Sequence, residues 1–315
     1  MIKENMHPAK LLIFGEYTIL LGSLALSIPF HSFGATLRFL CPEQDDPGGT
    51  AAKSNQNLQK LCDHFLESPE VFHEFLDVHR FHTDIDNGLY LSSTIPQCYG
   101  MGSSGALCAS IYSNYGVDKK DTSVGLSAEN MIMLRQMFMR MESFFHGRSS
   151  GFDPLVSYLK KPLLLGADGV VTCVDLPGHL IDGHDIVLVD SGLPCNTGPL
   201  VREFLSRFAP QGNTTPSGIS LTGMIDECIG AMLRGDPDET MDNIKMLSQF
   251  QLYELDHLIP KHFQACWAEG LRTGLFTLKL CGSGGGGYLI CFTHDKKQTV
   301  NYFETKTIPV IQVNR

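Results

Sequence analysis

A short loop rich in glycine and serine, set between an apolar strand and an apolar helix, constrains this sequence more than any other feature. The loop reads YGMGSSG over residues 99–105, and the apolar residues that follow it predict a helix over residues 104–112. Glycines 100 and 102 let backbone N–H groups approach an anion, and the helix directs the positive end of its dipole toward the same point. The loop therefore predicts a phosphate-binding site for a nucleotide.

Two widespread phosphate-binding motifs can be compared with this loop. A Walker loop needs the pattern G-x-x-x-x-G-K-[ST], and a dinucleotide-binding loop needs G-x-G-x-x-G followed by a helix and an acidic ribose ligand. The loop lacks the Walker lysine and so is not a Walker loop. Residues 100–105, GMGSSG, do fit the bare G-x-G-x-x-G spacing, which is weak evidence by itself, so a dinucleotide-binding fold must be judged by the motifs that accompany the loop. A capped helix after a tight turn would explain the loop without any ligand, so other motifs must decide between the two interpretations.

Two further segments, at opposite ends of the chain, accompany the loop. Residues 8–17, PAKLLIFGEY, form an apolar strand with Lys10 at its start and Glu16 at its end, and residues 279–292, KLCGSGGGGYLICF, place a glycine run between two strand-like segments. In this order the three segments resemble the signature motifs of the galactokinase, homoserine kinase, mevalonate kinase and phosphomevalonate kinase (GHMP) superfamily. The resemblance extends over nearly the whole chain.

Two other segments are most similar to the mevalonate kinases of this superfamily. Residues 142–153, ESFFHGRSSGFD, resemble a pattern in which a metal-binding glutamate precedes His-Gly and a catalytic aspartate follows Ser-Gly. Residues 190–201, DSGLPCNTGPLV, resemble the segment that carries an active-site threonine. Part of this wording also looks like phosphomevalonate kinases, which act on an already phosphorylated substrate, and Tyr17 stands where mevalonate kinases often have histidine.

The resemblance implies an α+β, GHMP kinase-like two-domain fold made of two-layer α/β sandwiches. It implies an ATP-binding N-terminal domain over residues 1–180, a C-terminal domain over residues 181–315 and an active site in the cleft between them. The residue patterns independently predict alternating strands and helices with a late β-hairpin, which favours a two-layer α+β architecture. Strands are expected at 10–16, 23–29, 34–40, 89–93 and 184–190, a hairpin at 162–174, and helices at 57–79, 127–145, 198–208, 222–234, 241–250 and 260–269.

The resemblance also implies roles for individual residues. Asp153 is expected to be the general base that accepts the proton of the acceptor hydroxyl, and Lys10 to orient it and stabilise the forming alkoxide. ATP is the expected phosphoryl donor, and Mg²⁺, a hard cation that prefers oxygen ligands, is expected at Ser104 and Glu142. Glu142 belongs to the C-terminal end of a predicted helix, where the dipole disfavours an acid, so a bound metal would explain its placement.

The resemblance further implies a set of ligand-binding residues. Those expected to hold the nucleotide are Gly100, Met101, Gly102, Ser103, Ser104, Gly105 and Thr197. Those expected to hold the acceptor are Glu16, Tyr17, Gly282, Ser283, Gly284 and Gly285.

Together these features predict an enzyme, an ATP-dependent phosphotransferase that converts mevalonate to 5-phosphomevalonate in isoprenoid biosynthesis. Phosphomevalonate kinase or another GHMP small-molecule kinase is the nearest alternative, and Arg148, Lys160 and Lys161 are the cations near the catalytic motif that would meet a substrate phosphate. An alternative of another class is a non-catalytic regulator that binds a ligand. That alternative predicts loss of the base or metal positions, which this sequence retains.

Composition restricts the partners. The chain has 315 residues and a formal net charge of −10 without a basic run, which disfavours binding to nucleic acid or an anionic membrane. Its ten cysteines include no C-x-x-C pair and are expected to be reduced thiols of a cytoplasmic protein. The apolar stretch 11–30 contains Glu16 and Pro29 and is interpreted as two strands joined by a turn, with no targeting segment. A small-molecule substrate is the expected partner, and a homodimer is left open.

Overall fold

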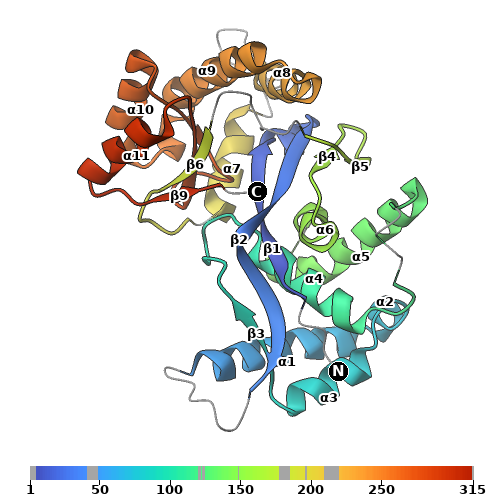
Figure 1. Cartoon of the computed structure of the whole chain (residues 1–315). Coiled ribbons are helices and arrows are strands. Elements are labelled where there is room, and N and C mark those ends of the chain that lie inside the picture. Colours follow the sequence, from blue (N-terminus) through green and yellow to red (C-terminus); the bar gives the residue numbers. More distant parts are fainter. Residues whose placement is uncertain are drawn as a thin grey trace. The chain divides into compact units, whose positions relative to one another are not determined.

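The computed structural model describes residues 5–40, 49–119, 122, 125–147, 149–176, 185–195, 197–208 and 220–313. Figure 1 shows its elements, labelled where there is room. The strands are β1 (His7–Phe14), β2 (Ala25–Phe39), β3 (Leu89–Ser93), β4 (Leu163–Leu165), β5 (Val171–Cys173), β6 (Asp185–Asp190), β7 (Thr277–Leu280), β8 (Tyr288–Thr293) and β9 (Val310–Gln312). The α-helices are α1 (Thr50–Glu67), α2 (Pro69–Phe72), α3 (Val78–Asp86), α4 (Ser103–Tyr115), α5 (Ala128–His146), α6 (Phe152–Leu159), α7 (Thr197–Phe208), α8 (Leu221–Arg234), α9 (Pro237–Glu254), α10 (Lys261–Thr273) and α11 (Lys296–Thr305). Two 3₁₀ helices are η1 (Thr18–Leu21) and η3 (Asp256–Leu258).

The chain forms two compact units, each assembled from three segments. Unit 1 consists of Met1–Lys10, Pro29–Ile95 and Gly102–Lys161, and unit 2 of Leu11–Ile28, Pro96–Met101 and Pro162–Arg315. Strands β1 and β2 contribute residues to both units. The division of the chain into domains at residue 180 remains a prediction.

Unit 1 is built around helix α4 and the second half of β2. Strand β3 pairs antiparallel with β2, from Ala35 opposite Ser93 to Phe39 opposite Leu89, and α1 packs on β3 (Figure 1). Helices α4, α5 and α6 pack against one another. Tyr112 of α4 and Phe138 of α5 are completely buried and meet edge to face, with ring centroids 5.5 Å apart. The aromatic core of unit 1 therefore fixes α4, which carries the end of the predicted phosphate loop.

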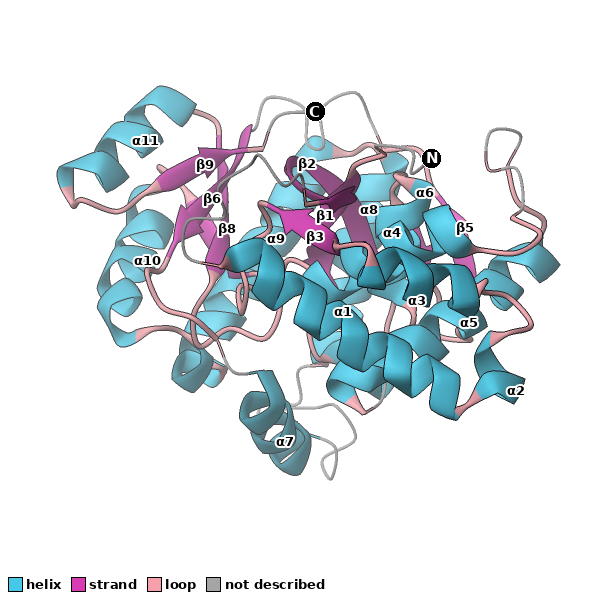
Figure 2. Ribbon diagram, turned by 90° about the horizontal axis from the view of Figure 1, so that it is seen from below, coloured by secondary structure: helices cyan, strands magenta, loops and turns pink. Residues whose placement is uncertain are grey.

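Unit 2 contains an antiparallel sheet with the strand order β7-β8-β6-β9. Helices α9 and α10 pack on β7, and α11 packs on β9. Figure 2 shows β6, β8 and β9 side by side, with α10 and α11 next to them. Trp267 of α10 is fully buried and donates to the Ser248 hydroxyl of α9 at 2.8 Å, which satisfies its indole N–H in the core. The hairpin β4-β5 pairs with Ala25–Ser27 of β2.

The helix starts follow local capping chemistry. The Ser127 side chain accepts from the backbone N–H of Asn130 at the start of α5. At the start of α9 the Asp236 side chain accepts from the N–H of Glu239, and Pro237 occupies the first helical position, where its missing N–H is not needed. These signals lie in the sequence itself, which is why the helix predicted over 127–145 matches α5 closely.

The mixed α+β composition predicted from the sequence is confirmed, and several boundaries differ. The strands expected at 23–29 and 34–40 are one strand, β2, in which Pro29 lies between the stretch that pairs with β4 and the stretch that pairs with β3. The helix expected at 57–79 is interrupted after Glu67. Pro69 explains the interruption, because proline disfavours helical geometry at the preceding residue, Ser68.

Other elements were missed or misplaced. Helix α6, which follows the Ser-Gly of the catalytic motif, was not expected, and neither was α11. The first strand was expected to continue to Glu16, but β1 ends at Phe14, so Glu16 and Tyr17 lie in the turn between β1 and η1.

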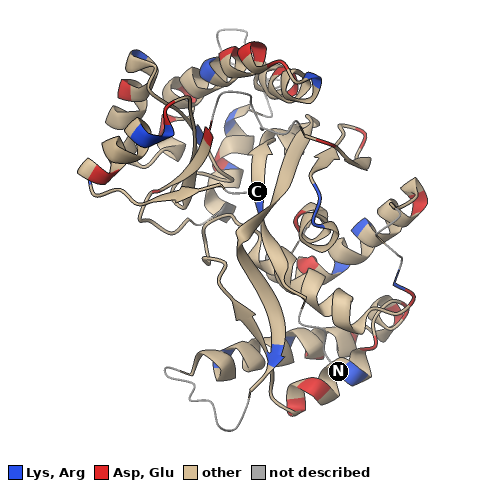
Figure 3. Ribbon diagram, in the orientation of Figure 1, with Lys and Arg blue, Asp and Glu red and all other residues tan. Residues whose placement is uncertain are grey.

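The surface of the described helices carries charges of both signs. Figure 3 shows acidic and basic residues interspersed along α9 and α10. Among the described residues, no helix combines the length and the apolar character needed to cross a membrane.

A substitution at Gly105 tests how closely α4 packs against α6. A Cβ at Gly105 would lie 2.9 Å from both the backbone carbon of Asp153 and the nitrogen of Pro154. Alanine normally stabilises a helix by about 1 kcal/mol relative to glycine, but here it must displace α6. We expect Gly105→Ala to lower the midpoint of urea unfolding.

The matched control is Gly223→Ala on α8. The nearest atoms to a Cβ there are 3.5 Å away, so we expect this variant to leave the unfolding midpoint unchanged or raise it. Equal stabilisation by both substitutions would contradict the close packing of α4 against α6.

Candidate active site

An ion pair between β1 and α6 lies at the centre of the candidate site in unit 1. Lys10 Nζ is 3.0 Å from Asp153 Oδ2, and the two side chains are 8% and 31% exposed. The lysine is therefore held inside unit 1, whereas the aspartate retains an accessible side on which a ligand could bind. Asp153 lies in the first turn of α6, where the helix dipole favours a negative charge.

The N-terminus of α4 meets this ion pair at Gly102. A Cβ at this position would lie 2.7 Å from Lys10 Cγ and 3.5 Å from Asp153 Oδ2. Gly102 also has φ +70°, a conformation that side chains rarely adopt. Glycine at this position therefore allows the start of α4 to approach the Lys10–Asp153 pair closely.

A second polar contact joins α4 to α5. The Ser104 hydroxyl donates to Glu142 Oε1 at 2.8 Å, and the Ser149 hydroxyl donates to Glu142 Oε2. Both carboxylate oxygens of Glu142 therefore accept from serine hydroxyls. Glu142 is 5% exposed and lies in the last turns of α5, as the sequence predicted.

The environment of Glu142 is unusual for a carboxylate. Its burial, and after that the negative charge of Asp153, raise the pKa of Glu142 to about 7, while hydrogen bonds from Ser149 and Ser104 and the charge of Lys10 act in the opposite direction. A negative charge on Glu142, in addition to that on Asp153, is therefore unfavourable in this site. A bound cation would relieve this penalty.

The residues present fit a magnesium ion. Mg²⁺ prefers oxygen ligands and usually keeps waters and phosphate oxygens around one or two carboxylates. The Ser104 hydroxyl and the Glu142 carboxylate offer such oxygens at the start of α4. Within the described part of the chain, no three His, Cys, Asp or Glu side chains gather closely enough to hold a metal. The protein would therefore contribute few ligands, as Mg²⁺–nucleotide sites require.

Ser149 is the residue of this cluster that the sequence did not predict. Its hydroxyl also accepts from the backbone N–H of Gly151 at 2.9 Å, so it links the loop before α6 to Glu142. Arg135 Nε donates to the Ser150 carbonyl at 2.9 Å, and a Cβ at Gly151 would lie 2.4 Å from the Arg135 carbonyl. The loop is thus fastened to α5, and no sequence signal singled out Ser149 from its neighbour.

In unit 2 the first half of the phosphate loop packs on the glycine run. A Cβ at Gly100 would lie 3.7 Å from the Cys281 carbonyl, and one at Gly287 would lie 3.0 Å from the Tyr99 carbonyl. The Tyr99 and Tyr288 rings meet at 5.0 Å between centroids. The structure therefore brings residues 99–100 and 281–288 together, although they are far apart in the sequence.

The predicted acceptor residues also gather in unit 2. Glu16 forms an ion pair with Lys279, the lysine that precedes the glycine run. The Tyr17 hydroxyl donates to the Ser283 carbonyl, and its ring stacks on Phe204 at 4.5 Å between centroids. Burial raises the pKa of Tyr17 well above its usual value, so the phenol stays protonated.

The structure describes the side chains of only some of the remaining predicted residues. Thr197 begins α7, but its side chain lies outside the described residues, and so does Arg148. Lys160 donates to Asn5 Oδ1 at 2.6 Å, and burial lowers its pKa, while Lys161 is exposed. Gly102, Ser104, Gly105, Glu142, Lys10 and Asp153 form one cluster in unit 1, and Gly100, Glu16, Tyr17 and the residues around Ser283 form another in unit 2.

Comparison of the sequence with protein-family models and with curated proteins finds no match. Comparison with solved structures finds similarity along the whole chain. Mevalonate kinase of L. major, solved in complex with R-mevalonate, is 15% identical with a TM-score of 0.62, covering 100% of this chain and 97% of that one. Phosphomevalonate kinase of Streptococcus pneumoniae, solved with phosphomevalonate and AMPPNP, is 14% identical with a TM-score of 0.60, covering 99% and 100%. The chain has the GHMP kinase fold.

A third similar structure shows how widely this fold is shared. Galactokinase of Lactococcus lactis, complexed with galactose, is 12% identical with a TM-score of 0.58, covering 98% of this chain and 92% of that one. The GHMP kinase fold expected from the sequence motifs is therefore confirmed. At such identities the fold carries no information on the acceptor.

The raised pKa of Glu142 predicts a pH dependence of metal binding. A metal competes with the proton for this carboxylate, so affinity should fall as the pH decreases below about 7. We expect Mn²⁺ to bind the complex with a non-hydrolysable ATP analogue about tenfold more weakly at pH 6 than at pH 8, measured by electron paramagnetic resonance.

Glu142→Gln is the control, because the nucleotide phosphates also titrate in this range. The variant should bind Mn²⁺ more weakly and lose the part of the pH dependence that belongs to Glu142. The same pH profile in both proteins would exclude Glu142 as a ligand.

Proposed function

We propose that this chain is an ATP-dependent kinase that phosphorylates the primary hydroxyl of mevalonate and releases ADP. The observation that carries the proposal is the Lys10–Asp153 ion pair at the N-terminus of α4, at the end of the glycine-serine loop. A carboxylate able to accept a proton, next to an ammonium and a phosphate-binding helix start, is the arrangement that phosphoryl transfer to an alcohol requires. The GHMP kinase fold supports the same reaction class.

The proposed mechanism uses the chain's own residues in three ways. The backbone N–H groups at the start of α4, with the Ser103 and Ser104 hydroxyls, bind the nucleotide phosphates. Asp153 Oδ2 accepts the proton of the acceptor hydroxyl while that oxygen bonds to the γ-phosphorus and the bond to the ADP oxygen breaks. Lys10 holds Asp153 in place and stabilises the negative charge on the acceptor oxygen.

Magnesium completes the proposal as a cofactor. Ser104 and Glu142 would hold it, and the ion would neutralise charge on the phosphate oxygens. Serine hydroxyls from Ser104 and Ser149 orient the Glu142 carboxylate for this purpose. Glu16, Tyr17 and the residues Gly282–Gly285 are the proposed acceptor side, and Thr197 remains a proposed nucleotide contact.

Phosphomevalonate is the second candidate acceptor. It is favoured by the part of the motif wording that also resembles phosphomevalonate kinases, including the phosphate loop at residues 99–105. Against it, Lys160, one of the cations proposed to meet a substrate phosphate, is already bonded to Asn5. Mevalonate therefore remains the first proposal. A cytoplasmic location is part of the same proposal.

The test is ADP release by the purified protein with Mg-ATP and mevalonate, phosphomevalonate or galactose in parallel. Preference for mevalonate is the expected result. Preference for another acceptor would replace the substrate and keep the reaction class. Absence of turnover with all three, together with retained ATP binding, would favour a non-catalytic regulator.

The role of Asp153 predicts a specific loss. Asp153→Asn should lower kcat by at least about 10²-fold, because the amide cannot accept the proton, while the dissociation constant of ATP changes little. Asp86→Asn, at an exposed acid on α3, is the control and should have wild-type activity. A kcat within about threefold of wild type in Asp153→Asn would exclude Asp153 as the base.

A further inference from the structure

A buried ion pair in unit 2 lies outside the proposed chemistry. Lys279 Nζ, on β7, is 2.5 Å from Glu16 Oε1, and the side chains are 0% and 2% exposed. The same ammonium donates to the Leu280 carbonyl at 2.6 Å and lies 5.6 Å from the centre of the Phe14 ring. The pair joins the end of β1 to the strand that leads into the glycine run.

Stability alone is a weak explanation for this pair. Taking two charges out of water costs several kcal/mol per ion, and replacing a buried pair by apolar side chains is often neutral or stabilising. Lys279 lies near Phe14 and Cys228, which belong to the buried hydrophobic core. Apolar side chains in place of the ion pair would therefore have apolar neighbours. The pair therefore invites an explanation in terms of what it positions.

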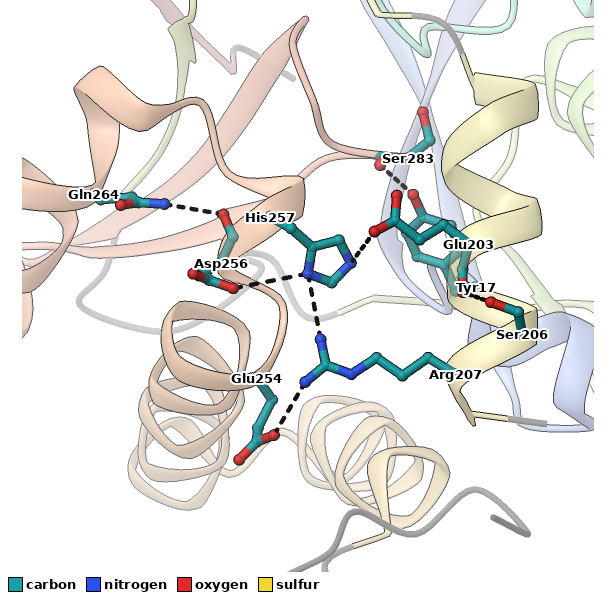
Figure 4. Close-up of polar contacts among 9 residues, drawn as sticks. All are labelled: Tyr17, Glu203, Ser206, Arg207, Glu254, Asp256, His257, Gln264 and Ser283. Atoms are coloured by element: carbon teal, nitrogen blue, oxygen red, sulfur yellow. Dashed lines mark hydrogen bonds and ion pairs between the residues drawn. The ribbon is translucent and has the colours of Figure 1, made fainter. Parts of the chain in front are cut away.

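Two contacts join the glycine run to the turn after β1. Glu16 reaches the Leu280 carbonyl through Lys279, and the next residue, Tyr17, donates directly to the Ser283 carbonyl. Figure 4 shows the Tyr17 hydroxyl directed at Ser283. Tyr17 has φ +63°, a conformation that a non-glycine residue adopts only when its surroundings enforce it.

Further bonds hold the other side of the same run. Cys195 donates from its thiol to the Gly284 carbonyl at 2.6 Å, and the N–H of Gly285 donates to Leu258 at 2.6 Å. A run of glycines is intrinsically flexible, so its single conformation depends on these contacts. The Lys279–Glu16 pair is the one contact among them that carries full charges.

We propose that Lys279 is a positioning residue for acceptor binding, acting through Glu16 and the turn that carries Tyr17. The proposal rests on the proposed kinase function and on Gly282–Gly285 being its acceptor side. It changes the role of Glu16 from a direct acceptor contact to a partner that fixes the geometry of Tyr17 and Ser283. The expected signature is a loss of acceptor affinity that does not follow the loss of stability.

The experiment compares Lys279→Met with the double variant Lys279→Met/Glu16→Met. The single variant leaves Glu16 buried without this ammonium and should lower the melting temperature. The double variant removes both charges at similar volume and should recover most of that loss. The KM for the acceptor should nevertheless be at least about tenfold above wild type both in the double variant and in Lys279→Met, which leaves Glu16 in place, with the KM for ATP within about twofold.

Lys296→Met is the matched control, because Lys296 forms a partly exposed pair with Asp185 at 3.6 Å in the same unit. It should change neither the melting temperature nor either KM. If the double variant recovers both its melting temperature and its acceptor KM, the pair is structural only and the proposal is wrong. If the double variant does not fold, Lys279→Gln/Glu16→Gln, which removes both charges and keeps polar side chains of similar shape, provides the same comparison.

A second readout separates this proposal from the proposed function. Amide hydrogen exchange of residues 281–287 should be faster in the double variant than in wild type and in Lys296→Met, whether or not the protein turns over an acceptor. Unchanged exchange in these residues would overturn the positioning role. Absence of kinase activity in the wild type, with faster exchange in the double variant, would instead contradict the proposed function alone.

Discussion

The ion pair between Lys10 and Asp153 is the interaction on which the candidate site depends. It joins the first strand to α6, and it requires α4 to pass so close that neither Gly102 nor Gly105 has room for a Cβ. The close approach also places the start of α4 next to the aspartate. Burial, and after it the charge of Asp153, raises the pKa of Glu142, so the placement of Asp153 also affects the second carboxylate of the cluster.

The two units differ in the balance of positive and negative charge among their buried side chains. The cluster in unit 1 contains the carboxylates of Asp153 and Glu142 and only one ammonium, that of Lys10, so its negative charge is not fully offset by the residues present. In unit 2, Glu16 and Lys279 balance each other within the core. This contrast supports a ligand-binding role for the first cluster and a positioning role for the second.

The motifs predicted the clustering of side chains better than the element boundaries. Lys10, Ser104, Glu142 and Asp153 were identifiable because their motifs have fixed wording and order, and the structure brings them together. Ser149 was not identifiable, because its contact with Glu142 depends on how the loop before α6 folds back on α5. The role of Lys279 was hidden for a similar reason, since its partner Glu16 lies 263 positions away. The interrupted helix after Glu67 was foreseeable from Pro69, whereas the continuity of β2 through Pro29 depends on its pairing with β3 and β4.

If Lys10 and Asp153 act together in phosphoryl transfer, as proposed, a double-mutant cycle on kcat will show it. Lys10→Met, Asp153→Asn and the double variant would be compared with wild type using Mg-ATP and the preferred acceptor. If the two residues act together, removing the second adds little to the loss caused by removing the first. The kcat of the double variant should therefore lie within about threefold of the kcat of the slower single variant. Losses that multiply in the double variant would show that the two residues act independently and would contradict the account.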